Sequence, residues 1–461
     1  RSLFTSTIDI SARTMRLQLQ HSITRSRKRP PHSLLRVLLV SALSVRTSWS
    51  YLSSTFSAVR LRSRTRSSRT TRCELQAAPK RLEENAGGVL YINDRCINCA
   101  ACSHFAPTVF ERNADILKHV VYHQQTLDQR GEMESARAAL AACPVAAIRV
   151  ENNIHGEDER ELKDALSIHH DQPFPQLMYP MQSADGETVD IGVYYLGHHN
   201  DASFGAIPYL ILGKSPDGKN IAVMVDVPRY SPSAVRAVKS LTASGPDYMF
   251  LTHVDDTADH NKWKKEFPAL KRIFHSGDLG RHNWIGDLTL EDVEVLLQEE
   301  NDSSSDDDLM MWDIGGNRLP ANKLDRMEQE EFLILHTPGH SPGSISLLFR
   351  PKLQPPNLRN TNLFSIDGKK IKYPSGIICT GDTYAWTTRD GGHMSGFPRY
   401  GNNLHMQAAT LQKLGNLSHM WDIIAPGHGH PRLYLEHDGG GGEGDEIKLN
   451  EMNDALEELL S

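Results

Sequence analysis

The sequence has few cysteines, and its N-terminal segment has almost no acidic residues. Only six cysteines occur in 461 residues, so a disulfide framework of the kind that stabilises small secreted domains is excluded. Residues 1–72 contain 15 Lys and Arg but a single acid, Asp9. After residue 75 no apolar run is long enough to cross a bilayer, so we expect no membrane partner.

The N-terminal segment has the composition of a targeting sequence. The run VLLVSALSV (37–45) follows the basic SRKRPP and is too short to span a membrane, which is typical of a signal core. A second Ser/Arg-rich stretch follows it, and this order resembles the two-part presequences of algae with secondary plastids. We therefore expect residues 1–78 to be a disordered presequence and the mature protein to lie in the plastid (chloroplast) stroma. The mitochondrial matrix is the alternative.

The remainder of the chain is acidic. Beyond residue 72 there are 35 basic and 56 acidic residues, a balance of −21. Because such a body repels a phosphate backbone, we expect no nucleic-acid partner.

Four cysteines have the spacing of an iron–sulfur site. Cys96, Cys99 and Cys102 are separated by two residues each, and Cys143 is followed by Pro144. Three thiolates in one loop can each reach a different iron of a cube, while a fourth at a distant helix end closes it. A zinc site would instead show two separated Cys-x2-Cys pairs. The pattern predicts a [4Fe-4S] cluster held by these four cysteines.

The segments RCINCAACSHFAP and AALAACPVAAI resemble single-cluster bacterial-type ferredoxins. The resemblance implies a ferredoxin domain over residues 85–152, and the lack of a second cysteine set implies one cluster. Within it, residues 132–142 read as a helix that ends at Pro144. The strand in GGVLYIND is expected to pair with the strand in AAIRVEN.

A second, larger unit begins near residue 180. Its short apolar strands end in polar residues, as in YMFLTHVDD, EFLILHTPGH, GIICTGD and DIIAPGHG. Such a pattern is typical of a site built on the loops at the ends of sheet strands. Residues 231–241 are predicted to form an outer helix capped by Ser231, and residues 259–267 a second helix.

These strand ends resemble the metal loops of the metallo-β-lactamase superfamily. The resemblance implies an α/β (α+β) fold, a four-layer αββα sandwich over residues 181–437, with two divalent metal ions, either Zn or Fe/Mn. It implies that His253 and His340 bind the first ion and that Asp382 bridges both. The second ion would be bound by Asp259, His260 and His428.

The first metal loop departs from the common pattern of that superfamily. THVDDTADH has no second histidine and is two residues longer, which resembles an uncharacterised branch found in cyanobacteria and plants. Since residues i and i+2 of an extended segment face the same side, Asp255 takes the place of that histidine as a ligand. Asp256 would point away unless the extra residues twist the loop. Either aspartate, if not a ligand, could act as general base.

Three functions follow as alternatives. The first is hydrolysis of a small ester, thioester or lactone, in which the ions convert a shared water to hydroxide by lowering its pKa to about 7. The second is a diiron oxidoreductase that acts on oxygen, a peroxide or a sulfur compound. It would receive electrons through the ferredoxin domain from an electron-donor protein. The third is a non-catalytic redox sensor or assembly module.

The remaining segments complete the expected domain organisation. Residues 153–180 are predicted to be a charged, partly helical linker, and residues 438–461 an acidic, Gly-rich tail with a C-terminal helix. Cys379 lies in an apolar strand and is predicted to be a small buried hydrophobic residue. Cys73 lies near the expected processing point of the leader.

Overall fold

The computed structural model describes the chain from residue 78 onward, with several gaps. The described residues are 78–126, 130–152, 156–167, 173–182, 188–298, 309–319, 330–351, 363–366, 369–372, 375–434 and 443–461. From Pro79 to Ser461 they belong to one unit. The expected presequence and Cys73 lie outside them. Among these residues the structure contains no helix with the length and apolar character of a membrane span.

Residues 78–152 form the small domain that contains the four cysteines. The predicted pairing of its terminal strands is confirmed, because β1 and β4 are antiparallel with Tyr91 opposite Arg149. The predicted helix is also confirmed as α2, whose small residues Ala136 and Ala139 are fully buried against Leu90. The elements are β1 (Leu90–Ile92), α1 (Ala101–Phe105), β2 (Phe110–Asn113), β3 (Lys118–Val121), α2 (Arg130–Ala142) and β4 (Ile148–Val150).

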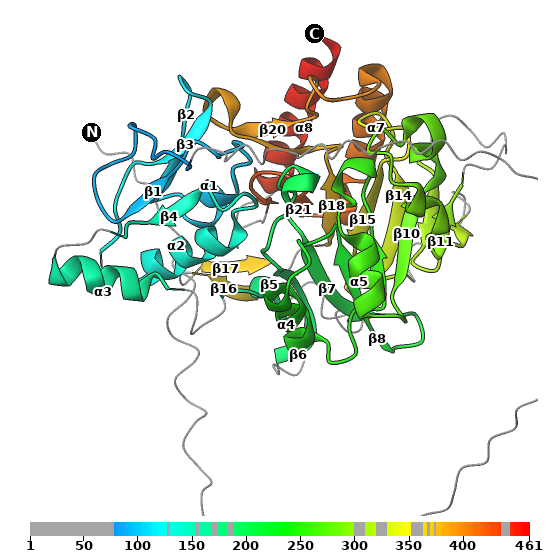
Figure 1. Ribbon diagram of the computed structural model, residues 1–461. Coiled ribbons are helices and arrows are strands. Elements are labelled where there is room, and N and C mark those ends of the chain that lie inside the picture. The colour runs from blue at the N-terminus through cyan, green and yellow to red at the C-terminus, as the bar shows by residue number, and fades with distance from the viewer. Residues whose placement is uncertain are drawn as a thin grey trace, which may run out of the picture. The chain divides into compact units, whose positions relative to one another are not determined.

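Two sheets of seven strands form the larger domain (Figure 1). The first sheet has the order β11-β10-β9-β8-β7-β6-β5. Its strands are β5 (Gln176–Gln182), β6 (Thr188–Tyr195), β7 (Tyr209–Lys214), β8 (Asn220–Val225), β9 (Tyr248–Phe250), β10 (Lys271–His275) and β11 (Val295–Leu297). The second has the order β13-β12-β14-β15-β18-β21-β22. Its strands are β12 (Met311–Asp313), β13 (Arg318–Leu319), β14 (Phe332–His336), β15 (Ile345–Phe349), β18 (Ile377–Gly381), β21 (Ile423–Pro426) and β22 (Arg432–Leu433).

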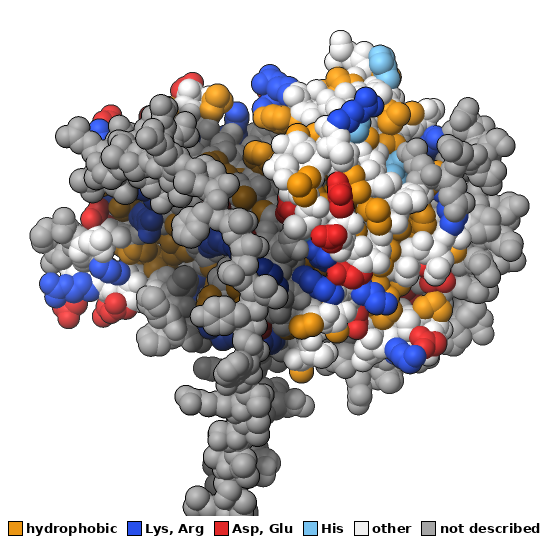
Figure 2. All heavy atoms as spheres, turned by 45° about the vertical axis from the view of Figure 1, so that its right-hand side comes forward, with side chains coloured by type: hydrophobic (Ala, Val, Ile, Leu, Met, Phe, Trp, Pro, Cys, Tyr) orange, Lys and Arg blue, Asp and Glu red, His pale blue; other side chains and the backbone are white. Residues whose placement is uncertain are grey.

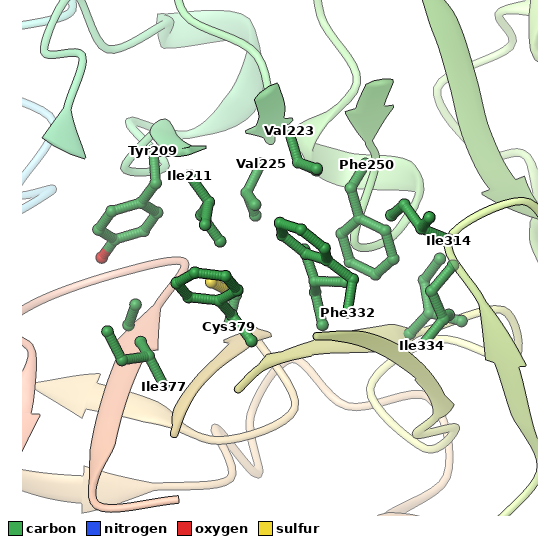
Figure 3. Packing of buried hydrophobic residues seen from close by; sticks show 14 of the residues in the cluster. Tyr209, Ile211, Val223, Val225, Phe250, Ile314, Phe332, Ile334, Ile377 and Cys379 are labelled. Carbon is green, nitrogen blue, oxygen red and sulfur yellow. The ribbon is translucent and has the colours of Figure 1, made fainter. Parts of the chain in front are cut away.

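The two sheets pack face to face through the alternate side chains of their strands (Figure 3). Ile211 and Val223 of the first sheet meet Ile334 and Cys379 of the second, and all four are fully buried. Because neighbouring residues of a strand point to opposite faces, the intervening residues face outward and are covered by helices. The prediction that Cys379 is a buried hydrophobic residue is confirmed.

Helices cover both outer faces, which confirms the four-layer arrangement. On the first sheet lie α4 (Pro232–Leu241) and α5 (His260–Glu266), which bury Val238 and Trp263. On the second lie α7 (Leu404–Asn416) and α8 (Glu443–Leu460), which bury Leu411 and Leu459. Ser231 caps α4 as predicted, since its side chain accepts a hydrogen bond from Ala234 N.

Two segments lie differently from the predicted organisation. The range 153–180 contains the expected helical part, α3 (Glu157–Ala165), but the first sheet already begins with β5 inside this range. The C-terminal helix α8 is a full member of the outer layer rather than a separate tail, because it packs along α7. Two small hairpins complete the structure, β16 (Leu363–Ile366) with β17 (Lys369–Lys372), and β19 (Ala385–Thr387) with β20 (His393–Ser395).

Candidate functional site

The four cysteines of the small domain line one cavity. Cys96 and Cys99 belong to the loop that leads into α1, Cys102 lies in the first turn of α1, and Cys143 follows the end of α2. Asn98 and Ala100 both have positive φ, 61° and 64°. These uncommon conformations turn the short loop back on itself, so that all three thiols face the same cavity.

The chemistry of these thiols fits a bound iron–sulfur cluster. Burial and the neighbouring thiols raise the pKa of Cys99 to about 12 and that of Cys102 well above its usual range. Four thiolates can share so small a space only when cations neutralise them, as iron ions do. Backbone amides already point at two sulfurs, since Ala147 N donates to Cys143 Sγ at 3.2 Å and Asn98 N to Cys96 Sγ at 3.4 Å. Such bonds stabilise cluster ligands.

Four strand ends of the larger domain bring imidazoles around one carboxylate. His253 follows β9, His340 follows β14, Asp382 follows β18 and His428 follows β21. The Nε2 atoms of His428, His340 and His253 lie 3.5, 3.8 and 4.0 Å from Asp382 Oδ2. The predicted convergence of these four residues is therefore found in the structure.

Two groups of ligand atoms share Asp382. One consists of His253, His340 and Asp382, and the other of Asp256, Asp382 and His428, with the atoms of each group within 4.8 Å of one another. Several of their polar atoms are buried without any hydrogen-bond partner: His253 Nε2, Asp382 Oδ1 and both carboxylate oxygens of Asp256. Because unpaired buried polar atoms are costly, this arrangement fits a pair of cations that would be bound by these residues.

Asp255 lies at the mouth of the site. Its Oδ2 is 3.7 Å from His253 Nε2 and 3.9 Å from His340 Nε2, so it lies beside the first group. The Asp255 side chain is 20% exposed, whereas that of His253 is 1% exposed. Burial works against its charged form, but the nearby imidazoles of His340 and His253 and a hydrogen bond from Trp284 outweigh this and lower the pKa of Asp255.

Asp259 and His260 do not join the site, which corrects the prediction that they bind the second ion. Asp259 Oδ2 accepts hydrogen bonds from Tyr230 N and Asn200 Nδ2 at 2.9 and 3.2 Å. His260 is held by Arg272 Nη1 on one ring nitrogen and by Asp287 on the other, both at 3.1 Å.

The physical reason for this correction is a short 3-10 turn. The longer loop coils at Val254–Asp256 directly after His253. The turn rotates Asp256 into the position that Asp259 was expected to fill. Asp256 is therefore a member of the second group, and of the two candidate bases only Asp255 reaches solvent.

Asp226 is a functional residue that the motifs did not reveal. It follows β8 with a positive φ of 54° and is 1% exposed, a strained and buried position for a carboxylate. Its Oδ1 accepts hydrogen bonds from Thr252 N and Thr252 Oγ1, both at 2.9 Å. Thr252 Oγ1 in turn lies 3.0 Å from His253 Nδ1. This chain orients the imidazole and leaves Nε2 free for a metal.

Asp278 was also missed, and it joins two of the ligand-bearing loops. Its carboxylate accepts from Val254 N at 2.9 Å, from Ser341 Oγ at 2.7 Å and from Gly343 N at 2.6 Å. In the chain, Val254 directly follows the ligand His253, and Ser341 and Gly343 follow the ligand His340. The sequence signal was present, since Asp278 follows the end of β10, but its partners lie far away in the chain.

Comparison with known proteins gives a match for the small domain. Residues 92–150 match the family model described as the 4Fe-4S single cluster domain of Ferredoxin I. A search of curated protein sequences found no match.

Among solved structures, metallo-beta-lactamases align with much of the chain at low identity. The DIM-1 metallo-beta-lactamase is 10% identical, with a TM-score of 0.33 and coverage of 61% of this chain and 99% of that one. The metallo-beta-lactamase from Erythrobacter litoralis is 11% identical, with a TM-score of 0.33 and coverage of 63% and 100%. FIM-1 from Pseudomonas aeruginosa, in its mono-zinc form, is 11% identical, with a TM-score of 0.29 and coverage of 55% and 93%.

The assignment of the larger domain depends on its own topology. Two seven-stranded sheets with helices outside carry histidines and aspartates at the strand ends that converge on Asp382. The chain therefore combines a domain that matches the single-cluster 4Fe-4S ferredoxin type with a four-layer α/β sandwich domain whose strand-end histidines and aspartates converge on Asp382.

Proposed function

We propose that the sandwich domain is a metal-dependent hydrolase of small ester, thioester or lactone substrates. The observation that supports this most directly is the pair of ligand groups joined by Asp382, with unpaired buried atoms directed into them. Two divalent cations held there would supply an activated water near neutral pH and would polarise a carbonyl group. No serine or cysteine nucleophile is then required.

The protein residues fix the geometry that such chemistry needs. Asp382 belongs to both groups and therefore sets their separation. The hydrogen-bonded chain from Asp226 through Thr252 holds the ring of His253, and Asp278 holds the loops on either side. Rigid placement of this kind is worth several kcal/mol to a reaction, roughly 7–11 kcal/mol in the best cases.

Asp255 is suited to move the proton of the attacking water. Its Oδ1 accepts a hydrogen bond from Trp284 Nε1, which fixes the carboxylate at the mouth of the site. Among the site's carboxylates it is the most exposed, at 20% of its side chain against 11% for Asp382 and 0% for Asp256. A proton accepted there can leave to solvent without crossing the buried part of the site.

The charge and the walls of the site favour a small, largely apolar substrate. Two divalent cations would nearly balance the three carboxylates of Asp255, Asp256 and Asp382, so there is little excess positive charge to attract a phosphate chain. Trp284 is 48% exposed beside Asp255 and offers an apolar surface. On the face shown in Figure 2, acidic and basic side chains are interspersed rather than gathered into a basic strip.

The experiment is a substrate screen of the full-length protein loaded separately with Zn²⁺, Mn²⁺ and Fe²⁺ under anaerobic conditions. Aryl esters, acyl thioesters and lactones are the probes, and released acid is the readout. We expect turnover in at least one metal form and its loss in Asp382→Asn. The matched control is His260→Asn, which alters a histidine outside both groups and should retain turnover. If protein that contains both ions hydrolyses none of these probes, the proposal is contradicted.

A further inference from the structure

The cysteine loop of the ferredoxin domain lies directly against a turn of the sandwich domain. A Cβ atom placed on Gly205 would fall 2.6 Å from Cys99 Cβ and 3.1 Å from Cys99 Sγ. Gly205 also has a φ of +87°, which a larger residue rarely adopts. Arg229 Nη1 donates a hydrogen bond to Pro144 O at 2.8 Å, immediately after Cys143. Two of the four cysteines are thus flanked by the other domain.

This interface is buried and apolar, so the two domains hold a fixed orientation. The ring of Phe105, at the end of α1, has its centroid 5.1 Å from that of Phe174, 5.5 Å from that of Tyr195 and 5.9 Å from that of His199. Phe174 is 2% exposed and packs with the small residues of α2. An interface packed in this way behaves like a domain core rather than a loose docking surface.

The same turn continues into the metal site. Gly205 O accepts a hydrogen bond from His199 Nδ1 at 2.9 Å. Two residues later, Ile207 N donates to Gly427 O at 2.8 Å, and Gly427 is bonded covalently to the ligand His428. A path from Cys99 to His428 therefore consists of one van der Waals contact, one hydrogen bond and otherwise covalent bonds.

We propose that the turn of residues 199–207 is an electron-transfer route between the cluster of the ferredoxin domain and the metal site of the sandwich domain. The ligand set suits this role, because three carboxylates beside three imidazoles favour iron over metals that prefer soft ligands such as thiolates. Each event moves one electron and no proton or bond. An external one-electron donor protein is oxidised, the cysteine-held cluster is reduced and reoxidised, and a ferric ion at the site becomes ferrous.

This proposal requires iron at the site but does not depend on hydrolysis. The test uses full-length protein with a reconstituted cluster and Fe³⁺ in the sandwich domain. One reducing equivalent of dithionite is mixed in anaerobically, and rapid-freeze Mössbauer and EPR spectra follow the ferric signal. In the wild type we expect the cluster to be reduced first and the ferric signal to decay as the cluster is reoxidised.

Gly205→Ala separates the turn from Cys99 and should slow the ferric decay several-fold, and cluster and iron are quantified in each sample so that decay rates are compared only between fully loaded molecules. Gly218→Ala is the matched control, because Gly218 also has a positive φ, +80°, but a Cβ atom placed on it would meet nothing within 4 Å. Equal decay rates in Gly205→Ala and the wild type would overturn the proposed route. Ferric decay without any prior reduction of the cluster would overturn it as well.

A second measurement does not depend on any variant. The sandwich domain is loaded with Mn²⁺ in one sample and with Zn²⁺ in another, and the spin relaxation of the reduced cluster is measured by EPR. We expect Mn²⁺ to speed the relaxation relative to Zn²⁺, because a nearby paramagnetic ion couples to the cluster. Identical relaxation in both samples would contradict the proximity. Hydrolysis by the Zn²⁺ sample is assayed separately, so failure of either proposal can be recognised by itself.

Discussion

Two buried carboxylates, Asp226 and Asp256, stand at the strand ends together with the partly buried Asp382. Burial raises the pKa of Asp226 to about 7 and that of Asp256 well above its usual range, and in both residues the charge of Asp382 adds to the shift. Without cations, the negative charges of these groups therefore oppose folding. Sites of this kind are maintained for function at a cost in stability.

Asp256→Asn tests this residue-scale account in chelator-treated protein. We expect the substitution to raise the midpoint of thermal unfolding in the metal-free form, because it removes a buried charge that has no partner there. In the presence of metal the order should reverse, because the wild type gains more from binding. The control is Asp259→Asn. The difference between its unfolding midpoint and that of the wild type should have the same sign with and without metal. A wild type that melts above Asp256→Asn without metal would contradict the account.

Trp284 is the second residue with a distinct consequence. It is nearly half exposed and donates a hydrogen bond to Asp255 Oδ1. For the proposed hydrolase, Trp284→Phe should retain the apolar surface but lose the hydrogen bond, and so lower kcat more than it raises KM. Trp284→Ala should also raise KM for substrates with large acyl groups. Steady-state kinetics on a series of acyl chain lengths checks this, and identical KM values across the series in Trp284→Ala would refute the substrate contact.

At the scale of elements, a buried lysine joins helix α8 to the turn that precedes β21. Lys448 Nζ donates to Ser418 O at 2.9 Å and to Trp421 O at 2.8 Å, and it lies 3.2 Å from Asp422 Oδ1. Its side chain is 0% exposed. Removing the charge leaves these acceptors without their donor in a buried place.

We therefore expect Lys448→Met to lower the free energy of unfolding by about 3–5 kcal/mol, the usual range when one partner of a buried charged pair is lost. Urea denaturation followed by tryptophan fluorescence measures the change. The control is Lys265→Met, an exposed lysine of α5, which should change stability by no more than about 0.5 kcal/mol. A change as small as this in Lys448→Met would show that α8 does not depend on the buried ammonium.

The elements themselves could largely be predicted from the sequence. Apolar runs such as those of β14 and β18, and the Ser231 cap of α4, are local signals, so strands and helices were found where expected. The turn at Val254–Asp256 could not be predicted, because its direction depends on Asp278 Oδ2 accepting a hydrogen bond from Val254 N across the sheet. The strand ends correctly predicted His253, His340, Asp382 and His428 as a group. Asp259 and His260 were misplaced because they follow the turn that could not be predicted.

At the scale of the whole molecule, the main result is the contact between the two domains. Nothing in the spacing of the cysteines or of the histidines indicates that Gly205 packs on Cys99, since 106 positions separate them and the fit depends on shape. His104 Nδ1 and His430 Nδ1 also meet across this interface, at 3.1 Å. The range predicted as a linker thus connects two tightly fitted domains rather than two independent ones.

The central claim is that five residues on strand-end loops hold two ions around Asp382: His253, Asp256, His340, Asp382 and His428. Its most direct test is the count of non-cluster metal per chain in anaerobically purified wild type, Asp382→Asn, Asp256→Asn and His260→Asn. The account predicts two ions in the wild type and in His260→Asn, and a loss in both aspartate variants. Full metal content in Asp382→Asn, or a loss in His260→Asn equal to that in Asp256→Asn, would contradict it.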